Sequence, residues 1–115
     1  MSDSCVFCKI VSEEAKATVV YRDSQVTAFR DIHPVAPIHI LIVPNKHIDS
    51  VDTLEPEDEQ LIGHIFTVAR KLATDEGISN GGYRVITNTG ANGGQTVFHL
   101  HVHLIGGQRM KYPMG

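Results

Sequence analysis

The chain has 115 residues, of which 42% are hydrophobic and 20% are charged, and its formal net charge is −3 with the histidines neutral. This length suits a single domain over residues 1–115, and the composition is that of an ordinary globular protein rather than a disordered one. The absence of a basic stripe argues against a nucleic-acid polymer as partner. The longest apolar run is far too short to cross a bilayer, so we expect no membrane partner.

The first residues and the two cysteines bear on the cellular compartment. Residues 1–4 read MSDS and lack the basic start and apolar run of a secretory signal. Cys5 and Cys8, without such a signal, favour a reducing compartment, and a metal or free thiols before a disulfide. We therefore expect a cytoplasmic protein.

The C-x-x-C spacing of Cys5 and Cys8 lets two thiolates reach one metal ion, which supplies half of a tetrahedral site. Two buried free thiols and a redox pair are the alternatives. A redox motif would need a helix start within a βαβ unit, and residues 9–11 do not indicate one. Two histidines elsewhere would have to complete a metal site, and His47, in a loop, is a candidate.

The hydrophobic pattern predicts an α+β fold, with an antiparallel sheet of about five strands and one main helix packed on it. The predicted strands are residues 17–22, 25–30, 38–44, 83–89 and 97–105. Asp23 and Ser24 join the first two strands as a tight hairpin. The third strand is strongly apolar except for His39, which we expect on the same face as the histidines of the last strand.

The main helix is predicted over residues 54–76, with Pro56 in its first turn and Gly77 just beyond its end. Its core face consists of Leu61, Ile65, Val68, Ala69 and Leu72. A second apolar face lies near Ile62, Phe66 and Ala73. The whole apolar surface of the helix is thus broader than contact with one sheet requires. A second copy of the chain would cover the second face most simply, so we expect a homodimer.

Residues 97–105 read VFHLHVHLI, in which histidines alternate strictly with apolar residues. Successive side chains of a strand point to opposite faces, so His99, His101 and His103 share one face. The other face consists of Phe98, Leu100, Val102 and Leu104. Three histidines on one face indicate chemistry rather than a solvated polar surface.

Residues 90–96 read GANGGQT and lead directly into the histidine face. An ordinary glycine-rich hairpin loop is one interpretation. The other is a nest of main-chain N–H groups that holds phosphate, with Asn88, Gln95 and Thr96 as side-chain donors. The loop lacks the Gly-Lys-Ser/Thr ending of a Walker phosphate loop. Its position beside the imidazoles favours the phosphate nest.

Neutral imidazoles beside a phosphate site suggest transfer at phosphorus, because histidine is a good nucleophile near neutral pH. His101 has a histidine of the same face on either side, which makes it the natural nucleophile. Asp31, at the end of the second predicted strand, is either a turn former or an acceptor for sugar hydroxyls. Residue type alone favours the turn former.

The sequence His-x-His-x-His followed by two apolar residues resembles the histidine triad (HIT) family. Flanking residues carry the resemblance further: residues 94–97 (GQTV), 105–110 (IGGQRM), 31–39 (DIHPVAPIH) and 44–48 (PNKHI). Together they cover nearly the whole chain, from about Cys5 to Gly115. The chain looks most like the Hint branch, the nucleoside phosphoramidate hydrolases.

The resemblance implies a hydrolase or transferase acting at the α-phosphorus of purine nucleoside phosphoramidates of the adenosine type, without an organic cofactor. His101 would attack phosphorus to form a nucleotidyl-histidine, and water would then release a nucleoside monophosphate. His103 would donate to a phosphate oxygen with His39 behind it, and Thr96 would donate to the leaving atom. The implied nucleotide-binding residues are Asp31, Ile32, Asn88, Gly94, Gln95, Thr96, His101 and His103.

Some relatives that begin with C-x-x-C carry zinc, whereas others lack the cysteines and do without it. The resemblance implies a structural zinc on Cys5, Cys8, His47 and His99. The competing interpretation is two free thiols, with His99 as an orienting residue. Thr96 replaces the usual serine of the Hint branch, and Tyr112 stands where some members have tryptophan, so the leaving group stays open. The alternative functions are a dinucleoside polyphosphate hydrolase, a non-catalytic nucleotide-binding regulatory module and a zinc-stabilised structural protein.

Overall fold

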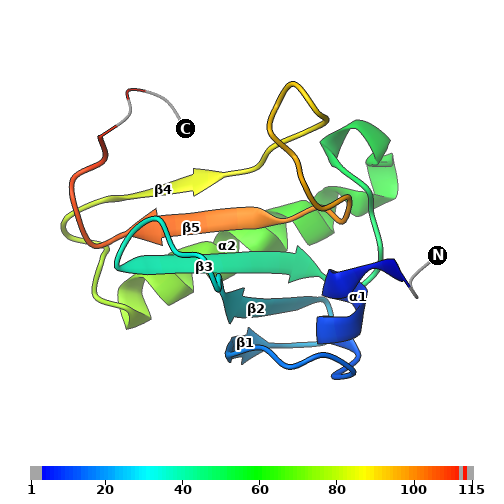
Figure 1. Ribbon diagram of the computed structural model, residues 1–115, viewed down its shortest axis with the longest axis horizontal. Helices are drawn as coiled ribbons and strands as arrows, with labels where there is room; N and C mark the ends of the chain where they lie inside the picture. The colour runs from blue at the N-terminus through cyan, green and yellow to red at the C-terminus, as the bar shows by residue number, and fades with distance from the viewer. Residues whose placement is uncertain (1–3, 112, 114–115) are drawn as a thin grey trace.

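The computed structural model describes residues 4–111 and 113, so Tyr112 lies outside the described residues. Five antiparallel strands form one sheet in the order β1-β2-β3-β5-β4, which confirms the predicted α+β fold (Figure 1). The elements are α1 (Val6–Val11), β1 (Val19–Arg22), β2 (Val26–Arg30), β3 (Ile38–Pro44), η2 (Val51–Thr53), η3 (Pro56–Asp58), α2 (Glu59–Asp75), β4 (Tyr83–Ile86) and β5 (Val102–Gly106).

The two faces of the sheet bury different sets of side chains. Helix α2 covers one face and packs against alternate residues of the central strands, including Ile40, Ile42 and Leu104 (Figure 1). On the other face, α1 packs Phe7 and Ile10 against a smaller apolar cluster. The odd-numbered residues of β3 and β5 face α1, so this smaller layer lies beside the histidines.

Helix α2 follows the predicted pattern with two differences. It begins at Glu59 rather than residue 54, because Pro56 starts a separate 3-10 turn whose Asp58 carboxylate accepts from the Glu55 N–H at 2.9 Å. Ala73 was assigned to the second apolar face but is fully buried in the core, whereas Phe66 is 52% exposed. Among the described residues, no helix is long and apolar enough to span a membrane.

Helix α1 is a feature that the sequence reading missed, since no helix start was recognised near residues 9–11. Cys5 is its N-cap, and the Cys5 Sγ accepts a hydrogen bond from the Cys8 N–H at 3.3 Å. A sulfur here does what a serine or aspartate oxygen does at other helix starts. Burial of Phe7 and Ile10, three residues apart, supplies the apolar face.

The last two strands are shorter than the predicted 83–89 and 97–105. Residues 97–99 form a bend, and the Leu100 N–H donates to the Ile48 carbonyl at 2.6 Å instead of to a neighbouring strand. Phe98, expected on the buried face, is therefore 52% exposed, whereas Leu100, Val102 and Leu104 are buried as predicted. Strand β4 ends at Ile86, which pairs with His103 near the start of β5.

Leu104 tests the packing of α2 on the sheet, because its side chain is fully buried between them. We expect Leu104→Ala to lower the free energy of unfolding by about 2–5 kcal/mol, through lost apolar burial and the cavity left behind. Urea denaturation measures this change. Val35→Ala is the control, since Val35 is 66% exposed and its truncation should cost less than about 0.5 kcal/mol. Equal losses in the two variants would contradict the described core.

Candidate active site and metal cluster

A cavity of about 380 Å³ lies between α1 and the histidine-bearing face of the sheet. Its apolar side includes Phe7, Ile10, Phe29 and Leu41. Its polar side includes Asp31, Thr96, His101 and His103. An apolar wall opposite a short row of polar groups suits a ligand with a flat ring at one end and an anionic group at the other.

The three histidines of the triad lie on one side of the chain, as predicted. Phe7 contacts the rings of His99 and His101 edge-on, at centroid distances of 6.0 and 5.1 Å. The rings of His101 and His103 lie 5.1 Å apart. The histidine side chains therefore stay on one side of the chain, both in the bend at residues 97–99 and in β5.

The hydrogen bonds of His101 fix its tautomer. Its Nδ1 lies 2.8 Å from the carbonyl oxygen of His99, which can only accept, so Nδ1 carries the proton. The Nε2 atom of the neutral ring is then unprotonated and has a lone pair available. The Thr87 hydroxyl donates to the carbonyl of His101 itself at 2.9 Å, which holds the main chain at this residue. His101 thus has the protonation pattern of a nucleophile.

A second chain of hydrogen bonds fixes the tautomers of His39 and His103. The Val35 N–H donates to His39 Nδ1 at 3.1 Å, so the proton of His39 is on Nε2. That Nε2 lies 2.9 Å from His103 Nδ1, to which it donates. The proton of His103 is consequently on its Nε2. His39 therefore lies beside His103, and His103 has an N–H left to donate to a ligand.

Burial keeps this histidine pair neutral. It lowers the pKa of His103 to about 4, and the neighbouring His101 and His39 act in the same direction. Burial also lowers the pKa of His39, although the nearby Asp31 carboxylate opposes the shift. At neutral pH both rings are uncharged, so His103 acts as a neutral N–H donor and not as a cation.

Asp31 makes a turn-forming contact, and its role as an acceptor for sugar hydroxyls stays a prediction. Its Oδ1 accepts from the His33 N–H at 2.8 Å, which is a turn-forming contact. Its Oδ2 lies 3.3 Å from His39 Nε2, and the residue lines the cavity. The next residue, Ile32, is 84% exposed and also lines the cavity, where it presents an apolar surface to a ligand.

The glycine-rich loop is held together mainly by its own hydrogen bonds. The Gly94 N–H donates to Ala91 O at 3.1 Å, and Asn88 Nδ2 donates to Gly93 O at 2.8 Å. The Gly94 N–H and the Asn88 amide are therefore used within the loop. That they bind nucleotide stays a prediction. Thr96 differs, because it lines the cavity and no hydrogen bond joins its hydroxyl to another of the described residues.

Gln95 also has its amide occupied within the chain. Its Nε2 donates to the carbonyls of Asp49 and Val97 at 2.7 and 3.0 Å, and its Oε1 accepts from the Gly90 N–H at 2.9 Å. The side chain is buried, with 5% of its surface exposed. It was predicted to bind nucleotide, but the structure gives it the contacts of a loop-ordering residue.

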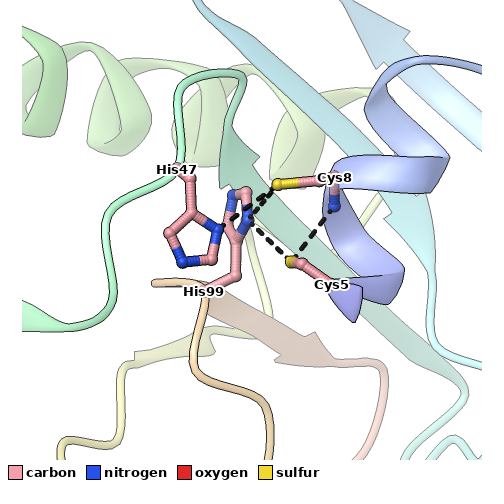
Figure 2. A group of neighbouring side chains, drawn as sticks. All are labelled: Cys5, Cys8, His47 and His99. Atoms are coloured by element: carbon pink, nitrogen blue, oxygen red, sulfur yellow. Dashed lines mark hydrogen bonds between the residues drawn. The ribbon is translucent and has the colours of Figure 1, made fainter. Parts of the chain in front are cut away.

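The four predicted metal ligands come together from three separate segments (Figure 2). Cys5 and Cys8 lie at the start of α1, His47 in the loop after β3 and His99 in the bend before β5. Nδ1 of His99 lies 3.3 Å from Cys5 Sγ and 3.5 Å from Cys8 Sγ, and Nδ1 of His47 lies 3.3 Å from Cys8 Sγ. One sulfur or nitrogen from each residue, all within 4.8 Å of one another, faces a common centre.

The outer hydrogen bonds of this cluster fit a metal. His99 Nε2 donates to Pro44 O at 2.9 Å, and His47 Nε2 donates to Asp49 Oδ1 at 2.8 Å. Both rings therefore present an unprotonated Nδ1 to the thiols, as ligation requires. Burial, together with Cys5, raises the pKa of the Cys8 thiol to about 11. A bound cation would reverse that effect and stabilise the thiolates.

A second group of metal-type side chains, Asp31, His39 and His103, fails the same test. His39 Nδ1 already accepts from Val35, so ligation through Nε2 would require an imidazolate. The proton on that Nε2 is instead shared with His103 and Asp31. Only the cluster with the cysteines has the ligand nitrogens of both its histidines free of protons.

The comparisons with known proteins agree with this geometry. A family model described as the HIT domain matches residues 12–110. A purine nucleoside phosphoramidase of Escherichia coli (strain K12) is 50% identical over 108 residues, covering 94% of this chain and 91% of that protein.

Two solved structures match almost as completely. A HIT family hydrolase from Legionella pneumophila Philadelphia 1 matches with a TM-score of 0.95 at 47% identity, covering 97% of this chain and 100% of that one. A zinc-bound histidine triad family protein from Mycobacterium smegmatis matches with a TM-score of 0.82 at 31% identity, covering 94% and 78%. The resemblance first carried by the alternating histidines is therefore confirmed, and the chain belongs to the HIT family.

Proposed function

We propose that this chain is a hydrolase that cleaves purine nucleoside phosphoramidates at the α-phosphorus, as one HIT domain over its whole length. The observation that carries the proposal is the pair of fixed tautomers, with a free Nε2 on His101 and an N–H on His103 in one cavity. The E. coli relative, a purine nucleoside phosphoramidase, supports the substrate class. A nucleoside phosphoramidate fits the cavity's division into an apolar and a polar side.

The reaction has two displacements at phosphorus. His101 Nε2 attacks and the bond from phosphorus to the leaving nitrogen breaks. Thr96 passes its hydroxyl proton to that nitrogen, which departs as an amine. His103 donates its Nε2–H to a non-bridging oxygen, where negative charge accumulates. Water then attacks the nucleotidyl-histidine and gives a proton back to the Thr96 oxygen, phosphorus separates from Nε2, and a nucleoside monophosphate leaves. Asp31 accepts from ribose hydroxyls and Ile32 contacts the base.

The alternatives are less well supported. A regulatory nucleotide-binding module would not need the unprotonated Nε2 that the His99 carbonyl imposes on His101. A purely structural metal protein would not need a second set of histidines outside the cysteine cluster. A dinucleoside polyphosphate hydrolase shares the chemistry, and the 50% identity to a purine nucleoside phosphoramidase favours the phosphoramidate.

His101→Ala tests the nucleophile. We expect turnover of an adenosine phosphoramidate to fall by at least about 10³-fold, because the covalent step is lost. Binding of adenosine monophosphate should change little, since Asp31, Ile32 and His103 remain. Enzyme and phosphoramidate are mixed rapidly and quenched, and the intact protein mass is measured. A nucleotide adduct should appear on the wild type and none on the variant.

His64→Gln is the matched control for this variant. His64 lies on α2, and its Nε2 donates to Asp23 Oδ2 at 2.6 Å, outside the lining of the cavity. It should retain both turnover and the adduct. Turnover of His101→Ala within a few-fold of the wild type would show that another residue attacks phosphorus.

We also propose that Cys5, Cys8, His47 and His99 hold a structural zinc ion. Two thiolates and two neutral imidazoles form a closed tetrahedral set with no open position for catalysis. The zinc-bound M. smegmatis structure supports the choice of metal. Both cysteines are free of disulfides, as a reducing cytoplasm would leave them.

Metal analysis of protein purified without chelator tests the zinc site. We expect close to one zinc per chain, and its loss in a Cys5→Ser, Cys8→Ser double variant, because hydroxyl groups do not replace thiolates as zinc ligands. Wild-type protein that is metal-free and fully active, with two titratable thiols, would instead favour the free-thiol interpretation.

A homodimer is the third part of the proposal. Phe66 on α2 is 52% exposed, and β4 is an edge strand whose outer side has no partner strand among the described residues. A two-fold association of two copies through this side of the chain would cover both features. Sedimentation at micromolar concentration should give about twice the mass of the chain, and Phe66→Asp should shift the equilibrium to monomer. A stable wild-type monomer would refute this part.

A further inference from the structure

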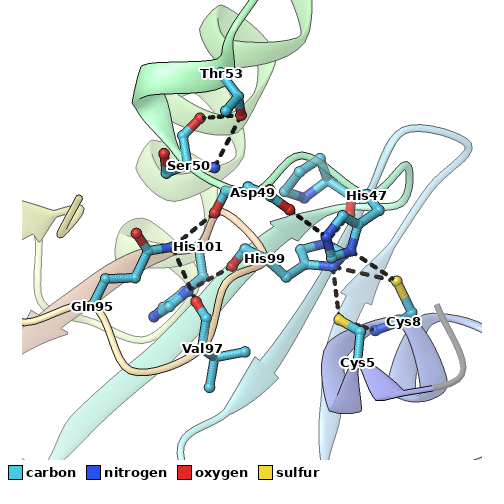
Figure 3. A network of polar contacts seen from close by, with 11 residues as sticks. Cys5, Cys8, His47, Asp49, Ser50, Thr53, Gln95, Val97, His99 and His101 are labelled. Carbon is cyan, nitrogen blue, oxygen red and sulfur yellow. Dashed lines mark hydrogen bonds and ion pairs between the residues drawn. The ribbon is translucent and has the colours of Figure 1, made fainter. Parts of the chain in front are cut away.

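The metal cluster and the glycine-rich loop meet at one residue, Asp49 (Figure 3). Its carboxylate accepts from His47 Nε2 at 2.8 Å, on the side of the metal ligands. Its main-chain carbonyl accepts from Gln95 Nε2 at 2.7 Å, on the side of the loop. Neither contact was expected from the sequence, and the reaction proposed above assigns no task to Asp49.

The main chain on both sides of Asp49 is fixed. The preceding carbonyl, that of Ile48, accepts from the Leu100 N–H at 2.6 Å, and Ile48 is buried. The following residue, Ser50, is also buried and caps the turn Val51–Thr53 through a hydrogen bond from the Asp52 N–H. Asp49 therefore has a fixed main chain, and its carboxylate and its carbonyl hold His47 and Gln95 in one arrangement.

Gln95 carries this constraint into the loop. The same amide that donates to Asp49 also donates to Val97 O, and its oxygen accepts from the Gly90 N–H. The Gln95 N–H donates in turn to Gly90 O at 3.0 Å, so the loop from 90 to 95 is closed at Gln95. Thr96 and Val97, the next two residues, line the cavity beside His101.

The carboxylate of Asp49 is 59% exposed, so its bond to His47 in the metal-free chain competes with water and is weak. A cation on His47 Nδ1 polarises the ring and strengthens the donation from Nε2 to the carboxylate. The bond from His47 to Asp49 is thus the part of the network that responds most to the metal.

We propose that Asp49 is a positioning residue that links metal occupancy of the cysteine cluster to the order of the 90–95 loop. Its carboxylate orients His47 for the metal, and its carbonyl holds Gln95 and thereby the loop that leads to Thr96. The inference rests on the proposed zinc site and is independent of the proposed reaction. The metal consequently acts on the cavity without touching the substrate.

The first experiment measures metal affinity. Metal-free wild type, Asp49→Ala, Asp49→Asn and Asp52→Ala are titrated with Zn²⁺ against a chelator of known affinity. We expect Asp49→Ala to bind roughly 10- to 100-fold more weakly, as is usual when an outer carboxylate partner of a ligating histidine is removed. Asp49→Asn should recover part of this loss, because its amide oxygen still accepts from His47 Nε2.

Asp52→Ala is the matched control. Asp52 is an exposed acid three residues further along the same segment, and its side chain makes no hydrogen bond to another of the described residues. The Asp52→Ala variant loses the same charge but keeps the partner of His47, so its affinity for Zn²⁺ should equal that of the wild type. Equal weakening in both alanine variants would show an effect of charge alone and overturn the proposal.

The second experiment measures the link to the loop, by hydrogen exchange of the amides of residues 90–95 with and without saturating Zn²⁺. In the wild type we expect the metal to slow exchange on the order of ten-fold, because loop opening becomes rarer. In Asp49→Ala, zinc should have little effect on the loop. The spectrum of bound Co²⁺ shows separately that the variant still uses both thiolates and both imidazoles.

The amides of α2 provide an internal reference, since zinc should change their hydrogen exchange similarly in all four proteins. Equal slowing of the loop in the wild type and Asp49→Ala overturns the proposal, as does a wild-type loop that does not respond to bound zinc. A wild type that binds no zinc in the first titration overturns the zinc site and this inference together. That outcome leaves the phosphoramidate reaction to its own test on His101.

Discussion

The site depends on one hydrogen bond, from His101 Nδ1 to the carbonyl of His99. It places the one N–H proton of the neutral imidazole on Nδ1 and leaves Nε2 unprotonated. A carbonyl two residues back can reach the ring because residues 97–99 bend before β5 begins. In a regular strand that carbonyl would pair with a neighbouring strand. The shortening of β5 therefore leaves the His99 carbonyl available to His101, for which we propose the role of nucleophile.

His99 contributes different groups to two sites. Its carbonyl serves His101, while its ring lies among the thiols and donates to the carbonyl of Pro44 at 2.9 Å. The side chain is fully buried, and burial is the main cause that lowers its pKa. A neutral, fully hydrogen-bonded imidazole can be buried at modest cost, whereas an imidazolium cannot. A metal held by this ring would fix the main chain that directs His101.

Much of the fold was predictable because it follows from periodicity. The alternation in residues 97–105 identified the histidine face, and the 3.6-residue pattern identified α2. The bend at 97–99 was not predictable, because it results from the hydrogen bond between Leu100 and Ile48, which lie far apart in sequence. Helix α1 was missed for a related reason, since its cap is a cysteine sulfur and its packing partners lie on β2 and β3.

The candidate site, like the fold, was predictable only in part. The residues with a family pattern around them, such as Asp31, His39 and Thr96, do lie at the cavity or against it. Gln95 was assigned to the nucleotide as a side-chain donor at the end of the glycine-rich loop, yet its amide is used by main-chain groups 2 to 46 residues away. Asp49 was not singled out at all. Contacts from a side chain to a distant carbonyl leave no pattern in residue type or spacing.

Helix α1 forms part of both the cavity and the metal cluster. A helix of six residues is too short to be stable alone, so Val6–Val11 must be held by its surroundings. Phe7 packs edge-on against Phe29 with centroids 5.4 Å apart, and both residues line the cavity. Cys5 and Cys8 flank this contact and join the helix to His47 and His99 on the other segments. The apolar wall of the cavity and the metal cluster are thus held by the same short helix. The C-x-x-C motif consequently shapes the binding site for a substrate that its sulfur atoms do not touch.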